Sequence, residues 1–215
     1  MAYAVVADIN LHTNITSLDV ANADVTSLIA EATAKVNSDI NIKVIRERVK
    51  SIDQTRENKI NGSNTFYYTQ NWRGVYLGDL DDDGDVDISD VIVYQVDSNG
   101  TETTPTISAV DDDDLKITLS SAPSSGVRLY ITYNYSRVRQ GTVDKRVKLA
   151  TIYLTAAMCY AKINIGKAPS MAFGSSRLTR HMKSYNHYME RYHGEIEKIN
   201  ELGGVVSSGE SNYKI

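Results

Sequence analysis

Hydrophobic side chains fall on nearly every face of the stretch 144–163, which reads DKRVKLATIYLTAAMCYAKI. One set recurs at spacings of three and four residues, the period of a single helix face. Its members are Leu149, Ile152, Tyr153, Ala156, Tyr160 and Ile163. A helix that is apolar nearly all round is buried on most sides, and the interspersed Lys, Arg and Thr residues argue against a membrane span. The pattern therefore predicts a core helix around which the chain is organised.

Two amphipathic helices are predicted, one before and one after this core helix in the sequence. The first covers about 22–39, with Asn22 as a suitable N-cap. Its apolar stripe consists of Val25, Leu28, Ile29, Ala32, Val36 and Ile40. The second begins near Ser176 and closes at Gly203, and its apolar residues alternate at spacings of four and three, which makes a heptad stripe. This stripe consists of Leu178, Met182, Tyr185, Met189, Tyr192, Ile196 and Ile199. We expect it to pack on its own domain, with a contact to another chain as the alternative.

Between residues 43 and 136 the hydrophobic period changes from that of helices to that of strands. Short runs of β-branched and aromatic residues alternate with turn signals such as Asn61-Gly62. The predicted strands are 44–52, 65–69, 74–77, 91–96, 106–110, 115–119 and 127–135. Strand 65–69 is expected to return along 44–52 as a hairpin. The region therefore predicts a small antiparallel sheet domain inserted between helices.

These elements predict an α+β fold with a helical core of three main helices and an inserted antiparallel β-sheet region. The helical domain is expected at 1–42 and 137–202, the β domain at 43–136, and a flexible C-terminal tail at 203–215. The tail still carries four apolar residues, Val205, Val206, Tyr213 and Ile215. Such residues suit a segment that becomes ordered on binding a partner, and an untethered terminus is the alternative.

Composition narrows the functional classes. The chain has 215 residues, of which 41% are hydrophobic and 23% charged, as in soluble globular proteins. Its single Cys159 excludes an intramolecular disulfide, and the start MAYAVVADIN lacks the features of a signal peptide. The HExxH, P-loop, GxGxxG and GxSxG motifs are absent, and the histidines lack the spacing of a metal site. We therefore expect that the protein is not an enzyme.

The net charge of −4 is unevenly distributed along the chain. Carboxylates gather between residues 79 and 114, whereas Lys and Arg dominate from 137 to 198. An acidic loop beside basic helix surfaces explains this distribution. The alternative is two faces of opposite sign, which would suit head-to-tail packing of subunits or an anionic partner.

The most specific motif is the Asp-rich stretch 79–90, which reads DLDDDGDVDISD. Its spacing matches a 12-residue calcium loop, with acids at positions 1, 3, 5 and 12, glycine at position 6, a carbonyl donor at 7 and a water-mediated ligand at 9. The residues are Asp79, Asp81, Asp83, Gly84, Asp85, Asp87 and Asp90. The stretch predicts a structural Ca²⁺ site, with a solvated acidic turn as the alternative. The second acidic run, 111–114, predicts only a solvated turn between strands.

The metal loop resembles those of dockerin modules, which carry Asp at position 12 where EF-hands usually carry Glu. The segment after Asp90, VIVYQV, is a predicted strand, and no entering helix precedes the loop. The resemblance therefore extends to the loop alone and implies no cohesin-binding role.

The helical stretches resemble those of head–tail connector proteins, also called adaptor or head-completion proteins, of long-tailed viruses. Ala7-Asp8-Ile9 precedes the helix VTSLIAEATAKVNSDI, and VKLATIYLTAAMCYAK is followed by an amphipathic helix. The resemblance covers 22–40 and 143–200. It implies a virion protein of the neck, assembled in the host cytoplasm into a ring, commonly of twelve copies, that joins capsid to tail beneath the portal.

The same resemblance implies the partners: further copies of the chain, the portal protein and a tail-completion or tail-terminator protein. The C-terminal segment would dock on the portal, and the genome would pass through the lumen without sequence-specific binding or any membrane contact. Two other classes stay open, namely a calcium-dependent binding or adhesion module and another neck or tail-completion protein.

Overall fold

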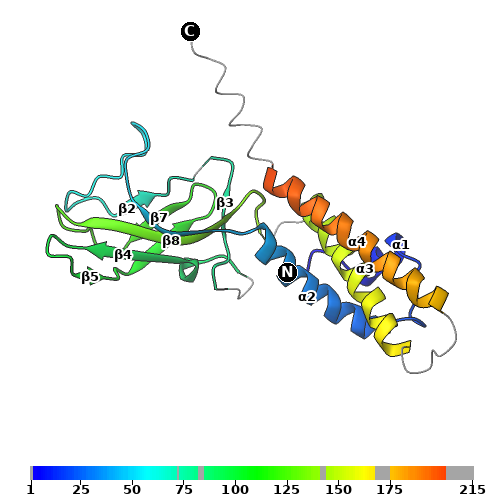
Figure 1. Cartoon of the computed structure of the whole chain (residues 1–215). Coiled ribbons are helices and arrows are strands. Elements are labelled where there is room, and N and C mark those ends of the chain that lie inside the picture. Colours follow the sequence, from blue (N-terminus) through cyan, green and yellow to red (C-terminus); the bar gives the residue numbers. More distant parts are fainter. Residues whose placement is uncertain (1, 72, 82–84, 141–143, 168–174, 202–215) are drawn as a thin grey trace, which may run out of the picture. The chain divides into compact units, whose positions relative to one another are not determined.

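The computed structural model describes residues 2–71, 73–81, 85–140, 144–167 and 175–201 and shows an α+β protein (Figure 1). The chain divides into two compact units. The helical unit comprises Met1–Asp39 and Val143–Ile215, and the β unit comprises Ile40–Thr142. The predicted fold class, helices with an antiparallel β region inserted between them, is confirmed.

Four helices are described outside the β region, and three of them form a bundle. They are α1 (Val6–His12), α2 (Asn22–Ile40), α3 (Lys145–Lys167) and α4 (Ser175–Glu201). Near the start of α2, Asp24 pairs with Lys162 close to the end of α3, at 2.9 Å. Near the end of α2, Asp39 accepts a hydrogen bond from Tyr192 in the second half of α4. α2 therefore runs antiparallel to α3 and in the same direction as α4 (Figure 1).

α3 forms the core of the helical unit, as the sequence predicts. Ile152 is only 1% exposed and Ala156 is fully buried. Leu149 and Tyr160 share the predicted face but are half-buried, and Tyr160 stacks on Tyr188 of α4 with ring centroids 5.7 Å apart. Among the described residues, no helix combines the length and apolar character needed to cross a membrane.

The stripe predicted on α2 is buried except at one position. Val25, Ile29, Ala32, Val36 and Ile40 are buried, and Leu28 is half-buried. The spacing of three and four residues thus identified the face of α2 that meets the rest of the bundle.

Among the described side chains, the heptad stripe predicted on α4 is fully buried only toward the C-terminal end of that helix, and Tyr185 and Met189 are half-buried. Its buried members are Tyr192, Ile196 and Ile199. Met182 is 53% exposed, and the side chain of Leu178 lies outside the described residues. Tyr188, which is not in the stripe, packs instead against the ring of Tyr153 at 6.3 Å and donates a hydrogen bond to the carbonyl of His12. In a straight helix, residues that repeat every seven positions shift around the helix axis by about 20° per heptad. A heptad stripe that is buried at one end of such a helix therefore turns toward solvent at the other end.

The described strands of the β unit form two antiparallel sheets. The strands are β1 (Ile42–Arg48), β2 (Phe66–Tyr68), β3 (Tyr76–Gly78), β4 (Val91–Val96), β5 (Glu102–Thr103), β6 (Ile107–Asp111), β7 (Lys116–Leu119) and β8 (Arg128–Ser136). The larger sheet has the order β1-β8-β4-β5, with β3 also paired to β8, and the smaller has the order β2-β7-β6.

The predicted hairpin between β1 and β2 is wrong. β1 pairs with β8, and β2 pairs with β7 in the other sheet. Asn61-Gly62 does form a turn, with Gly62 at a φ of +81°, and the Gly62 N–H donates to the carbonyl of Pro123 at 3.1 Å. Hairpin loops usually have two to five residues. The connection from Arg48 to Phe66 is much longer, and it crosses from one sheet to the other.

One hydrophobic core lies between the two sheets. The larger sheet and its flanks contribute Val49, Val75, Leu77, Val91, Val93, Leu129, Ile131 and Tyr133, and the smaller contributes Tyr67, Leu115, Ile117 and Leu119. Alternate residues of β4, β7 and β8 supply this core, as expected for strands with one face buried. The β unit therefore has its own core.

Candidate metal centre

The Asp-rich loop 79–90 leaves and rejoins the same edge of β8. β3 ends at Gly78, opposite Asn134 of β8, and β4 begins at Val91, opposite the adjacent residue Tyr133. β3 and β4 thus continue one another along β8, and the loop is an excursion between them. Backbone pairing therefore closes the loop at its base.

Three carboxylates of this loop converge. Asp79, Asp81 and Asp90 each place an oxygen within 4.8 Å of the other two, and we call them the carboxylate cluster. Asp79 and Asp90 are 3% and 1% exposed, whereas Asp81 is exposed. They occupy positions 1, 3 and 12 of the predicted calcium loop. Burying like charges together is unfavourable unless a cation or hydrogen bonds offset the repulsion, so the cluster could hold a metal ion.

A short turn at the end of the loop positions Asp90. Asp87 caps the 3₁₀ turn η1 (Ile88–Asp90) and accepts hydrogen bonds from the N–H and hydroxyl of Ser89, at 2.7 and 2.6 Å. The Asp90 carboxylate accepts from the N–H of Asp87, at 2.7 Å, and from that of Leu80. Burial raises the pKa of Asp90, and the other two charges of the cluster add to the rise against the opposing effect of these hydrogen bonds. The carboxylate is thus fixed in position and favours a positive neighbour.

Carboxamides from outside the loop hold the backbone of Asp79. Its N–H donates to Oε1 of Gln140 at 3.0 Å, and its carbonyl accepts from Nδ2 of Asn41 at 3.0 Å and of Asn134 at 2.7 Å. Gln140 also donates to Oδ1 of Asn41 at 2.7 Å, and Oδ1 of Asn134 is buried without a hydrogen-bond partner. These three residues lie 38 to 61 positions from Asp79, and no sequence motif identifies them.

Of the other residues named for the predicted calcium loop, two are outside the described part of the chain and two are exposed. Asp83 and Gly84 lie outside the described residues. Asp85 and Asp87 are exposed, and the carboxylate of Asp87 accepts its hydrogen bonds from Ser89. Their expected roles, a carbonyl ligand and a water-mediated ligand, stay predictions. The predicted docking residues of the tail, Val205, Val206, Tyr213 and Ile215, also lie outside the described part of the chain.

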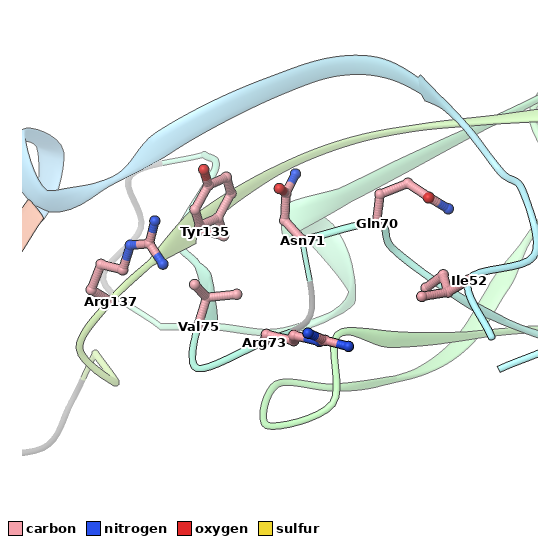
Figure 2. A pocket seen from close by; sticks show the side chains of 7 residues that line it. All are labelled: Ile52, Gln70, Asn71, Arg73, Val75, Tyr135 and Arg137. Atoms are coloured by element: carbon pink, nitrogen blue, oxygen red, sulfur yellow. The ribbon is translucent and has the colours of Figure 1, made fainter. Parts of the chain in front are cut away.

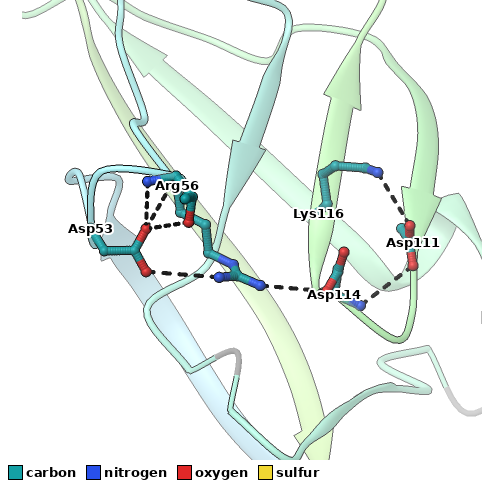
Figure 3. A network of polar contacts seen from close by, with 6 residues as sticks. Asp53, Arg56, Asp111, Asp114 and Lys116 are labelled. Atoms are coloured by element: carbon teal, nitrogen blue, oxygen red, sulfur yellow. Dashed lines mark hydrogen bonds and ion pairs between the residues drawn. The ribbon is translucent and has the colours of Figure 1, made fainter.

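The second acidic run forms the turn between β6 and β7, and cations pair with several of its carboxylates. Figure 3 shows Lys116 paired with Asp111 at 3.2 Å. Arg56 lies between Asp53 and Asp114, at 3.7 Å from each. These ion pairs differ from the arrangement in loop 79–90, where three carboxylates converge on one another.

Cys159 is a packed core residue of α3. It is fully buried, and burial raises the pKa of its thiol to about 11. The thiol therefore stays protonated at neutral pH and lacks the thiolate character of a reactive cysteine.

Comparison of the chain with protein-family models gave no match, and comparison with curated proteins gave none either. The resemblance to head–tail connectors therefore rests on the helical stretches of the sequence alone.

Proposed function

We propose that loop 79–90 binds one Ca²⁺ ion in a structural role. The observation that carries this proposal is the convergence of positions 1, 3 and 12 of the loop, Asp79, Asp81 and Asp90. An all-oxygen set suits a hard cation. Ca²⁺ lies about 2.3–2.6 Å from its ligands, so oxygens on opposite sides are up to about 5 Å apart. The oxygens of the carboxylate cluster all lie within 4.8 Å of one another, which is compatible with Ca²⁺.

The position of the loop supports the proposed structural role. Both of its ends pair with β8, and Asp79 is bonded through its backbone to Asn41, Asn134 and Gln140. Neutralising the cluster would remove the repulsion between its charges and stabilise the β unit around the loop.

Titration of Ca²⁺ into chelator-stripped protein tests the metal site. We expect one site per chain by isothermal titration calorimetry and a rise in the melting temperature. Asp81→Asn should weaken binding at least tenfold, because the exposed Asp81 contributes one of the three charges of the cluster. Asp113→Asn, in the turn between β6 and β7, is the matched control and should bind as the wild type does. Absence of heat and of a thermal shift in the wild type would exclude the site.

We further propose that the protein is a structural virion protein, a head–tail adaptor that forms a ring beneath the portal and joins capsid to tail. The stretches that resemble this family, 22–40 and 143–200, contain α2, α3 and most of α4. The supporting observation is that these three helices pack into one unit although the β unit separates them in sequence. The partners are further copies of the chain, the portal protein and a tail-completion or terminator protein.

Assembly and attachment can be measured separately. Light scattering after size-exclusion chromatography should find a ring of about twelve copies. Deleting 205–215 should leave the fold and calcium binding intact but abolish co-sedimentation with portal-containing particles. Retention of the truncated protein at the wild-type level would show that another surface makes the joint.

A calcium-dependent binding or adhesion module is the second candidate, favoured by the position of the carboxylate cluster in a β unit with its own core. A stable monomer that binds a ligand only in the presence of Ca²⁺ would favour this function over the adaptor.

A further inference from the structure

A second candidate site lies in the β unit, where the segment after β2 meets the end of β8 (Figure 2). It is a pocket with a volume of about 330 Å³. Its lining residues are Ile52, Gln70, Asn71, Arg73, Val75, Tyr135 and Arg137. The volume is at the lower end of the range for small-molecule sites. Two of the seven lining residues are arginines and none is acidic.

Arg137, directly after β8, supplies an unsatisfied donor. Its Nε is buried and has no hydrogen-bond partner, and no carboxylate of the described residues forms an ion pair with it. By contrast, Arg139 pairs with Asp112 at 2.9 Å. A buried guanidinium N–H without an acceptor is unfavourable, so Arg137 would gain from an anion in the pocket.

The nearby carboxylate of Glu47 is already engaged. Its two oxygens accept hydrogen bonds from the backbone N–H of Gln70 at 2.7 Å, from Nδ2 of Asn71 at 3.2 Å and from the hydroxyl of Tyr133 at 2.9 Å. Gln70 also donates to the carbonyl of Lys50 at 2.9 Å. These bonds fix the wall formed by Gln70 and Asn71, so the pocket is held open before any ligand enters.

Arg73 brings a second cation to the same pocket. Figure 2 shows Arg73 and Arg137 on different sides of the space, with Asn71 and Gln70 along a third. Val75 is buried and contributes an apolar surface beside the charged groups. A small ligand with one anionic group and a short apolar part would match this lining.

We propose that this pocket binds a small oxyanion, a carboxylate or phosphate group, through the guanidinium of Arg137, with Arg73 adding positive charge. The planar guanidinium fork matches the geometry of both groups. The proposal is independent of the metal site and of the adaptor function.

Inorganic phosphate and succinate, titrated separately into full-length protein at low ionic strength, test the proposal. We expect at least one of them to bind with heat that isothermal titration calorimetry can measure. Arg137→Gln should weaken binding at least tenfold. The matched control Arg139→Gln, which removes an exposed arginine paired with Asp112, should bind within twofold of the wild type. Tighter binding of phosphate would indicate a phosphate ester as the ligand, and tighter binding of succinate a carboxylate.

The proposal is overturned if neither anion binds the wild type, or if Arg137→Gln and Arg139→Gln weaken binding equally. Should Arg137→Gln fail to fold, Arg137→Lys and Arg73→Gln replace it, because both leave a cation in the pocket. Weaker binding by both of these variants supports the site, and unchanged affinity in both overturns it.

Discussion

Two buried tyrosine hydroxyls each donate a hydrogen bond to a carboxylate. Tyr133 in the β unit bonds Glu47 at 2.9 Å, and Tyr192 in the helical unit bonds Asp39. Burial is the main cause that raises the pKa of both phenols. At neutral pH each phenol is therefore protonated and can donate its hydrogen bond to the carboxylate.

These phenols should make the protein less stable in alkaline solution. An unfolded tyrosine loses its proton near pH 10, whereas the folded forms of Tyr133 and Tyr192 retain it. Above pH 10 the unfolded state therefore binds fewer protons than the folded state, and the unfolding free energy falls as pH rises, by up to about 1.4 kcal/mol per pH unit for each group. Below pH 10 this contribution is complete and constant.

Urea unfolding between pH 8 and pH 11 measures the effect. Tyr133→Phe and Tyr192→Phe should each reduce the alkaline slope. A slope that neither substitution changes would contradict the assignment of the pH dependence to these two residues.

At the scale of single residues, spacing identified the carboxylates that converge but not the groups that support them. Asp79, Asp81 and Asp90 lie within one loop of twelve residues, and the geometry of that loop fixes their spacing. This spacing can be found in the sequence without knowing the fold. Asn41, Asn134 and Gln140 reach Asp79 because of how the β unit folds, and their residue types are common in turns. Long-range hydrogen bonds of this kind have no local signature.

At the scale of elements, α3 is the part of the helical unit whose packing matters most. Ile152→Ala should lower the unfolding free energy of the protein by about 2–5 kcal/mol, since it removes a fully buried side chain and leaves a cavity. Met182→Ala on the exposed end of α4 is the matched control and should change it by less than about 0.5 kcal/mol. Chemical denaturation measures both, and a loss below about 0.5 kcal/mol for Ile152→Ala would contradict the central place of α3.

Gly78, the last residue of β3, leaves room for the support of the metal loop. A Cβ atom at this position would lie 2.4 Å from Oδ1 of Asn41 and 3.2 Å from Cβ of Asn134. Gly78→Ala should therefore displace Asn41 from Asp79 and weaken Ca²⁺ binding about fivefold, the equivalent of one hydrogen bond.

Calorimetric titration of Gly78→Ala measures this affinity. Gly194→Ala is the control, because a Cβ at Gly194 in α4 meets nothing within 4 Å. It should stabilise the helix by about 1 kcal/mol and leave the metal affinity unchanged. Equal affinities for Gly78→Ala and the wild type would show that the contact with Asn41 does not support the loop.

Strand positions were more predictable than strand partners. Runs such as VIVYQV and VRLYITYNY matched β4 and β8 closely, because alternation of apolar residues is local. β5 was missed, since it has two exposed residues and no apolar pattern. The pattern of β1 was weak because its pairing with β8 shifts register between Val44 and Glu47, where Arg46 has a φ of +54°. Whether β2 pairs with β1 or with β7 depends on contacts distant in sequence, which no short window contains.

At the scale of the whole molecule, the β unit begins and ends at neighbouring places. Ile42 at the start of β1 lies opposite Tyr135 near the end of β8, and Asn41 accepts a hydrogen bond from Gln140. Replacing 43–136 by a short Gly-Ser linker should therefore leave a folded helical unit. Circular dichroism should retain the helical signal and a cooperative thermal transition, and the loss of that transition would show that the helices need the β unit to fold.

The adjacency of those two chain ends also affects the order in which the protein folds. As long as 40–142 is unfolded, α2 is separated from α3 by a flexible loop of about 100 residues, and closing it costs about 2.7 kcal/mol more entropy than closing a loop of about 5 residues. Once β1 has paired with β8, the two ends of the segment lie close together. The additional entropy cost of bringing α2 and α3 together has then already been met by folding of the β unit. During synthesis α2 emerges before α3 and α4, and pairing of β1 with β8 lowers the entropy cost of bringing the three helices together.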